Sequence, residues 1–191
     1  MNSTVEISGL IHRHTPMDAR AVRILMDAGA LPNDGRVELV DRETINVSPS
    51  NDPHYAALSG LIFELRNHPS RDYSVIADAA VYLSDTLMLG PDIVILRRPL
   101  LSREAIGPDF DLIIEISHST LAQDLGWKAA RYARHGVREY WVVDLENRKL
   151  HVHLQPSVDG YASITALNWD TEARPHLLPG LSLTPAEILA Q

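Results

Sequence analysis

Two acidic residues occupy positions where a carboxylate could hold a divalent cation. Glu115 interrupts the apolar run Phe110–Ser117, which would otherwise read as a fully buried strand. Because burying an uncompensated charge is costly, Glu115 should be paired, protonated or bound to a cation. Asp92 follows Gly90-Pro91 at the start of a second apolar run. An exposed edge position or a salt bridge to an arginine would explain Glu115 without any metal.

A shared cation becomes favourable if the fold brings these two carboxylates together. Two carboxylates about 4 Å apart repel by roughly 4 kcal/mol at an effective dielectric of about 20, and a divalent cation reverses the sign of that energy. The chain contains no cysteine, so its metal ligands are oxygen or imidazole. Hard oxygen ligands favour Mg²⁺, with Mn²⁺ as the alternative.

Other chemistries have weaker support in the sequence. His151 and His153 share one face of a predicted strand at a spacing that can bind transition metals, but no third ligand is evident nearby. The sequence has no Gly-x-Ser-x-Gly elbow and no cysteine nucleophile, and it lacks both glycine-rich signatures of nucleotide-binding folds. Covalent catalysis and dinucleotide binding are therefore disfavoured.

The elements that must position these residues can be predicted from capping signals and hydrophobic periodicity. Helix-start signals stand at Thr15-Pro16-Met17-Asp18, at Asp52-Pro53, at Thr120 with Gln123 three residues later, and at Thr184-Pro185. These signals predict helices over residues 16–28, 52–67 and 120–136 and a short helical turn from Thr184. Short alternating or aliphatic runs predict strands over 35–40, 44–47, 74–77, 80–83, 92–96, 112–117, 138–144, 149–154 and 161–166.

This order of elements predicts an α/β fold built on a mixed β-sheet that helices flank. Residues 1–191 are expected to form one domain, with 1–14 flexible, and Trp127, Tyr140 and Trp141 are expected in its core. No segment approaches the roughly 18 uninterrupted apolar residues of a membrane span. A soluble, cytoplasmic protein without membrane partners is therefore expected.

The charge pattern permits a local site for phosphates. A net charge of −8 argues against a protein coated with lysine for non-specific binding of polyanions. Lys128, Arg131, His135 and Arg138 nevertheless recur at about helical spacing and predict a basic stripe. A solvated charged face explains the stripe equally well, and Asp124 with Lys128 could be a surface salt bridge of under about 1 kcal/mol.

Several of these residues follow one another in a recognisable order. The order comprises Pro91-Asp92, Glu115-Ile116-Ser117, Asp124, Lys128 and the block Tyr132–Asp144. Val37–Asp41, Ser48-Pro49 with His54, and Leu178–Leu181 extend it to about residues 15–190. This arrangement resembles the "putative restriction endonuclease" family of the Uma-two type, within the PD-(D/E)XK nuclease superfamily. The resemblance implies a restriction-endonuclease-like fold, with a mixed β-sheet flanked by helices.

The resemblance also assigns roles to individual residues. It implies a metal site formed by Asp92, Glu115, Glu38 and the main-chain carbonyl of Ile116. Ser117 stands where the superfamily carries its catalytic lysine on the strand. Lys128, on the helix that follows, is the candidate replacement for that lysine.

The predicted function is hydrolysis of phosphodiester bonds in DNA by a Mg²⁺-dependent endodeoxyribonuclease, in which Lys128 assists the attacking water. A homodimer is expected if both strands of a duplex are cut. Ser117 and the acidic net charge leave a second interpretation open, in which a degenerate nuclease fold binds nucleic acid or a protein partner. A metal hydrolase for a small phosphate ester would use the same carboxylates.

Overall fold

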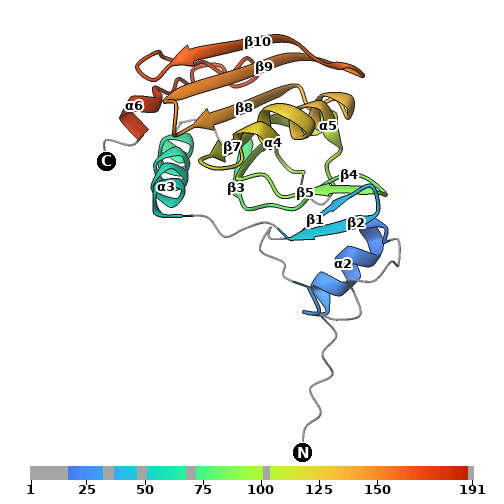
Figure 1. The fold of residues 1–191 in the computed structure, drawn as a ribbon. Helices are drawn as coiled ribbons and strands as arrows, with labels where there is room; N and C mark the ends of the chain where they lie inside the picture. The colour runs from blue at the N-terminus through green and yellow to red at the C-terminus, as the bar shows by residue number, and fades with distance from the viewer. Residues whose placement is uncertain (1–16, 32–36, 47–50, 68–71, 101–103, 189–191) are drawn as a thin grey trace, which may run out of the picture.

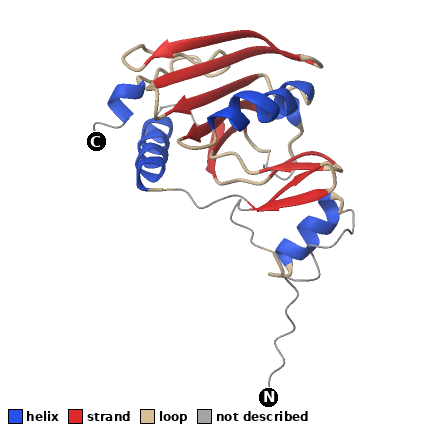
Figure 2. Cartoon of the chain, in the orientation of Figure 1, coloured by secondary structure: helices blue, strands red, loops and turns tan. Residues whose placement is uncertain are grey.

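Two β-sheets and the helices packed on them make up the structure of the protein (Figure 1, Figure 2). The computed structural model describes residues 17–31, 37–46, 51–67, 72–100 and 104–188. The predicted flexible segment 1–14 lies outside these residues. Within the described ranges, no helix is both long and apolar enough to cross a membrane.

The larger sheet has six strands in the order β10-β9-β8-β7-β6-β3. Its strands are β3 (Tyr73–Ala77), β6 (Ile93–Arg97), β7 (Phe110–Ser117), β8 (Glu139–Asp144), β9 (Lys149–Ser157) and β10 (Gly160–Asn168). β7 pairs in parallel with β8 and antiparallel with β6, so the predicted mixed sheet is confirmed. Every residue of β7 is buried, because one hydrophobic cluster covers each face of the sheet.

The crossover between β7 and β8 differs from the single helix predicted over 120–136. It consists of α4 (Leu121–Gln123), a π-helical turn (Asp124–Lys128) and α5 (Ala129–Arg134). Gly126 interrupts it with φ −98° and ψ −106°, which lie outside helical values. The helical region still ends at Gly136, which has φ +79°, as the sequence predicts.

The opposite face of the large sheet is covered by α3 (Asp52–Asn67) and α6 (Pro185–Ile188). The predicted bounds of α3 match the structure. Trp141 packs in this cluster, and Tyr140 is buried on the other face of β8, so both are core residues as predicted.

The second sheet was not predicted as a separate unit. It has the order β2-β1-β5-β4 and is formed by β1 (Val37–Val40), β2 (Glu43–Asn46), β4 (Val81–Ser84) and β5 (Leu87–Leu89). The sequence predicted the β1–β2 hairpin but not β5, whose three residues are too short to show a period. On the outer face of this sheet, Val37 and Leu39 pack against the amphipathic helix α2 (Ala19–Asp27). Strand alternation directs Glu38 to the other face.

Helix α2 begins later than predicted. Asp18, rather than Thr15, caps it, and the Asp18 carboxylate accepts a hydrogen bond of 2.7 Å from the main-chain N–H of Ala21. Thr15 and Pro16 lie outside the described residues.

The close approach of α3 and α6 depends on Gly60. A Cβ atom at this position would lie 2.5 Å from the main-chain oxygen of Ile188 and 2.8 Å from its Cγ2 atom. Any larger residue must therefore push the two helices apart.

We predict that Gly60→Ala lowers the free energy of unfolding, measured by urea denaturation. Overpacking costs about 1–3 kcal/mol, whereas alanine gains no more than about 1 kcal/mol from helix propensity. Ser59→Ala, at the exposed neighbouring position, is the control and should leave stability almost unchanged. A Gly60→Ala protein as stable as the wild type would contradict the close helix contact.

Candidate active site

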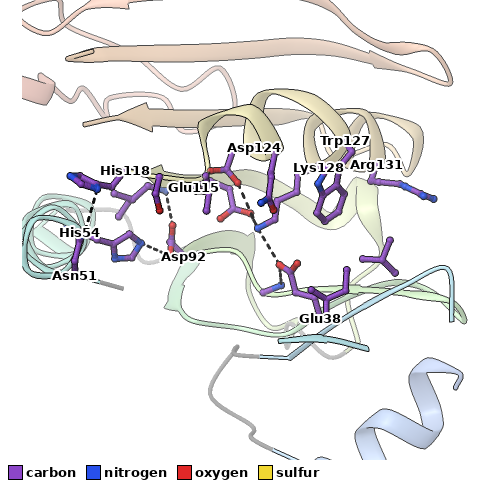
Figure 3. Close-up of a pocket in the computed structure, with 17 residues that line it drawn as sticks. Glu38, Asn51, His54, Asp92, Glu115, His118, Asp124, Trp127, Lys128 and Arg131 are labelled. Carbon is purple, nitrogen blue, oxygen red and sulfur yellow. Dashed lines mark hydrogen bonds and ion pairs between the residues drawn. The ribbon is translucent and has the colours of Figure 1, made fainter. Parts of the chain in front are cut away.

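A cavity of about 840 Å³ opens between the two sheets, the start of α3 and the crossover (Figure 3). It is lined by every predicted site residue: Glu38, Asp92, Glu115, Ile116 and Lys128. These residues come from distant parts of the chain. Glu38 lies on β1, Asp92 immediately precedes β6, and Glu115 lies on the central strand β7.

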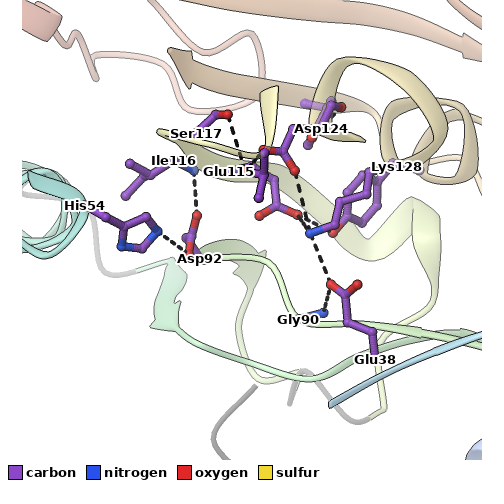
Figure 4. A network of polar contacts seen from close by, with 12 residues as sticks. Glu38, His54, Gly90, Asp92, Glu115, Ile116, Ser117, Asp124 and Lys128 are labelled. Carbon is purple, nitrogen blue, oxygen red and sulfur yellow. Dashed lines mark hydrogen bonds and ion pairs between the residues drawn. The ribbon is translucent and has the colours of Figure 1, made fainter. Parts of the chain in front are cut away.

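Lys128 lies at the centre of the acidic cluster (Figure 4). Its Nζ atom is 3.1 Å from Glu38 Oε1, 3.1 Å from Glu115 Oε1 and 3.7 Å from Asp124 Oδ1. The Lys128 side chain is only 9% exposed, and the three acids are buried. The pair Asp124–Lys128 is therefore part of a buried network rather than a surface salt bridge.

Neighbouring donors fix the three carboxylates in place. Glu115 Oε1 also accepts a hydrogen bond of 3.1 Å from the Tyr132 hydroxyl. Gly90 N–H donates to Glu38 Oε1 at 3.2 Å. Thr120 occupies the N-cap position of α4 as expected, but its hydroxyl donates to Asp124 Oδ2 at 2.6 Å and makes no side-chain capping bond. The Thr120 hydroxyl thus orients an acid of the cluster.

The electrostatics of the cluster follow from three buried carboxylates around one ammonium group. Burial raises the pKa of Glu115 well above its ordinary value; Lys128 opposes this shift, and the charges of Asp92 and Asp124 add to it. Burial likewise raises the pKa of Asp124. For Lys128, burial favours the neutral amine, but Glu115 and its acidic neighbours outweigh that effect and raise the pKa above its usual range. Lys128 is therefore held protonated.

Asp92 is held by a different set of contacts. Its Oδ1 atom is 2.9 Å from His54 Nε2, and its Oδ2 atom accepts a hydrogen bond of 2.6 Å from the main-chain N–H of Ile116. Burial would lower the pKa of His54, but the hydrogen bond and charge of Asp92 raise it overall. The sequence analysis included His54 in the order of residues that resembles the family, but it predicted no function for this residue. Its position in the first turn of α3, after the Asp52-Pro53 start signal, was the available clue.

Strand β7 carries Ser117 where the superfamily has its catalytic lysine. The amine next to Glu115 comes from Lys128 on the crossover instead. The Ser117 hydroxyl lies 3.4 Å from that of Thr120. The amine of Lys128 thus reaches the acidic strand from the crossover, where the sequence placed the replacement. The catalytic role of Lys128 stays a prediction.

The donors in this cavity match Mg²⁺ or Mn²⁺ in chemical type. All the acidic ligands are hard oxygen donors, and the three carboxylates around Lys128 exceed its single positive charge. In the described ranges, however, no three His, Asp or Glu side chains are already arranged to enclose an ion. Lys128 lies between Glu38 and Glu115, and Asp92 is turned towards His54. The residues therefore fit a divalent cation by charge and donor type, but in the described ranges their side chains are not arranged around one.

The predicted basic stripe is divided among separate contacts. Arg131 forms an ion pair with Asp41, and Arg138 Nη1 lies 3.9 Å from the buried Asp111. His135 Nδ1 is 2.9 Å from the main-chain oxygen of Arg131. Together with the burial of Lys128, these contacts contradict an open row of phosphate-binding cations.

His151 and His153 each lie beside an oxygen atom of β8. His153 is buried with Nδ1 3.2 Å from the Tyr140 carbonyl oxygen, and His151 Nε2 is 3.6 Å from Asp144 Oδ2. In the part of the chain that the structure describes, these histidines belong to no metal-binding group. Trp127, expected in the core, is half-buried: it packs against the hydrophobic cluster on this face of the sheet and also lines the cavity.

A mixed sheet whose central strand carries Glu115, beside a second acid and a lysine from the crossover, is the architecture of a restriction-endonuclease-like nuclease fold. Comparison with known proteins supports this class. The sequence matches the Uma2 family, described as "Putative restriction endonuclease", over residues 25–186. The chain belongs to this family, so the predicted family is confirmed.

Among solved structures, the protein is similar to a putative nuclease belonging to DUF820 from Anabaena variabilis ATCC 29413. The TM-score is 0.66 and the identity is 17%, covering 87% of this chain and 97% of that chain. At this identity the likeness establishes the fold alone, and it confirms the predicted fold class. No curated protein matches the sequence.

We predict that Lys128→Met lowers the free energy of unfolding by about 3–5 kcal/mol in EDTA at neutral pH, because buried acids lose their cation. Lys149→Met is the matched control, since Lys149 is the chain's other lysine and its bond to Asn168 is exposed. Adding Glu115→Gln to Lys128→Met should recover part of the loss. Chemical denaturation measures all four proteins.

The loss in Lys128→Met should shrink as the pH falls from 8 to 5. The folded-state pKa of Glu115 is raised above its unfolded value, so its contribution to stability is fully present below the unfolded pKa and is lost as pH rises through the folded pKa. Removing Lys128 raises this pKa further, which makes the cost largest at high pH. A loss below about 1 kcal/mol with no pH dependence would contradict the buried network.

Proposed function

We propose that this protein is a metal-dependent endonuclease that hydrolyses phosphodiester bonds in DNA. The observation that carries the proposal is the convergence of Lys128 with Glu38 and Glu115, each at 3.1 Å, inside one cavity that Asp92 also lines. Membership of the Uma2 family and the nuclease-like fold support it.

The acids would hold the metal ion that the reaction needs. Asp92, Glu115, Glu38 and the main-chain carbonyl of Ile116 are the proposed ligands of Mg²⁺ or Mn²⁺. When bound, such an ion acidifies a water molecule and neutralises charge on the phosphate oxygens. Burial makes the charged form of Glu115 costly. A bound divalent cation would offset this cost, because the three carboxylates around Lys128 carry more negative charge than its ammonium group neutralises.

Lys128 acts as a donor in this proposal rather than as a base. Its pKa is raised by the surrounding carboxylates, so it keeps its proton at neutral pH. A protonated amine can stabilise the negative charge that develops on the nucleophile and the phosphate. His54 and the Ile116 N–H hold the two oxygens of Asp92 and so fix the direction of that carboxylate.

One observation favours the alternative of a degenerate module that binds nucleic acid or a protein partner. Lys128 already bridges the acids, and Ser117 occupies the usual lysine position. Such a module would bind its partner whether or not metal is present. The homodimer and the cytoplasmic location stay predictions.

We predict that the purified protein cleaves DNA in the presence of Mg²⁺ or Mn²⁺ and that EDTA abolishes the cleavage. Asp92→Asn and Glu115→Gln should each lower the cleavage rate roughly 100-fold or more, since each removes a proposed ligand. Glu146→Gln, at an exposed acid outside the cavity, is the control and should keep the wild-type rate. Absence of cleavage on duplex, single-stranded and branched DNA and RNA at every salt concentration would refute the nuclease.

Metal binding can be tested apart from catalysis. Isothermal titration calorimetry with Mn²⁺ should show binding by the wild-type protein and its loss in Asp92→Ala and in Glu115→Ala, because each variant lacks a carboxylate donor. Circular dichroism verifies that both variants are folded. Nucleic-acid binding that is indifferent to metal and to both substitutions would support the binding module instead.

A further inference from the structure

We infer that this site takes a nucleotide whose base is unpaired, and that the base stacks on Trp127. The inference rests on the proposed function, because a phosphate held by the proposed metal ion at the acids is what brings the base to this end of the cavity. Trp127, Val40 and Ile45 form what we term the base slot.

The crossover presents Trp127 on the same side as the acidic cluster. Asp124, Trp127 and Lys128 belong to the π-helical turn that Gly126 interrupts, and Arg131 follows in α5. All four line the cavity. Figure 3 shows Trp127 between Lys128 and Arg131, with its ring directed into the cavity. The indole therefore lies immediately beside the amine that contacts the acids.

The β1–β2 hairpin supplies the opposite, aliphatic wall of the slot. Glu38 and Val40 share the inner face of β1, and Ile45 is the cross-strand partner of Glu38. Val40 and Ile45 line the same cavity as the acid. Ile45 is 43% exposed, which is unusual for an isoleucine on the inner face of a sheet. An apolar, flat ligand would cover this surface.

An ion pair joins the hairpin to the crossover beside the slot. Asp41 lies in the hairpin turn, where Asp41 and Arg42 have positive φ angles of 52° and 73°. The Asp41 carboxylate accepts two hydrogen bonds from the Arg131 guanidinium, one of them at 3.0 Å. The hairpin is thereby joined to α5 one helical turn after Trp127. The two walls of the slot are thus connected by a contact within the chain.

The charges around the cavity favour an unpaired strand over a fully paired duplex. Lys128 and Arg131, the lysine and the arginine among the described residues that line the cavity, are already bonded to carboxylates. The net charge of the chain is −8, and duplex binding depends mainly on the neutralisation of phosphates. Stacking of a base on an aromatic ring supplies affinity without such cations. A cavity of about 840 Å³ also lies within the size range of ligand pockets.

Fluorescence anisotropy in Ca²⁺, with gel electrophoresis to verify that each probe stays intact, tests the inference, because a cation then occupies the acids while binding is measured separately from cleavage. The probes are labelled 12-nucleotide thymidine and uridine homopolymers and a fully paired hairpin duplex of equal length. We expect tighter binding of a single strand than of the duplex, and the two homopolymers distinguish DNA from RNA. Trp127→Ala should weaken single-strand binding about 5- to 150-fold, whereas Trp127→Phe should stay within about threefold of the wild type.

Phe63→Ala is the control for non-specific stacking, because Phe63 is an exposed aromatic residue outside the cavity. The Phe63→Ala variant should bind the single-stranded probes as tightly as the wild type does. Preference for the duplex, absence of oligonucleotide binding, or single-strand binding unchanged in Trp127→Ala would overturn the inference. Cleavage in Mg²⁺ that is insensitive to Trp127→Ala would also overturn it while leaving the nuclease intact. Trp127-dependent binding without cleavage would refute the nuclease and retain the base slot.

Discussion

The structure depends on one buried ammonium group that compensates several buried acids. Lys128 contacts Glu38 from the four-stranded sheet, Glu115 from the six-stranded sheet and Asp124 from the crossover that follows. A buried charge is tolerated only where partners of opposite sign surround it, so these three elements must meet at this point. The same contact therefore fixes the relation of the two sheets and the chemistry of the cavity.

The sequence predicted the parts of this arrangement that depend on local patterns. The bounds of α3 and the central strand β7 follow from capping residues and apolar runs, and Glu115 stood out because a carboxylate in such a strand is costly. The separate second sheet was not predictable in the same way. Strand β5 has three residues, and its place beside β1 depends on contacts made across the chain.

The difference between the predicted full burial of Trp127 and its observed partial burial has a definite physical reason. An aromatic residue in a helix beside apolar neighbours is usually part of a core, and burial was the natural expectation. Yet the turn that carries Trp127 is π-helical and is interrupted at Gly126, so helical periodicity does not give the direction of its side chain. In the structure, Trp127 lines the cavity together with Asp124 and Lys128. His54 was harder to assign, because its partner Asp92 lies 38 positions later in the sequence.

The carboxylates of the cavity differ in how firmly they are held. Asp92 has both oxygens occupied, by an imidazole and a main-chain N–H, and so its orientation is set before any ligand arrives. Glu38 is held by Lys128 and a single N–H from Gly90. The orientation of Asp92 is thus set by α3 and the six-stranded sheet. The position of Glu38 depends on how the four-stranded sheet packs against the crossover.

The location of Glu38 on the hairpin has a consequence for how the acidic cluster is assembled as the chain folds. The remaining acids and Lys128 belong to the six-stranded sheet and its crossover, which can pair their backbone groups without the hairpin. A partly folded chain can therefore carry an intact large sheet and an incomplete acidic cluster. An acidic cluster divided in this way is complete only when the four-stranded sheet has packed against the six-stranded sheet.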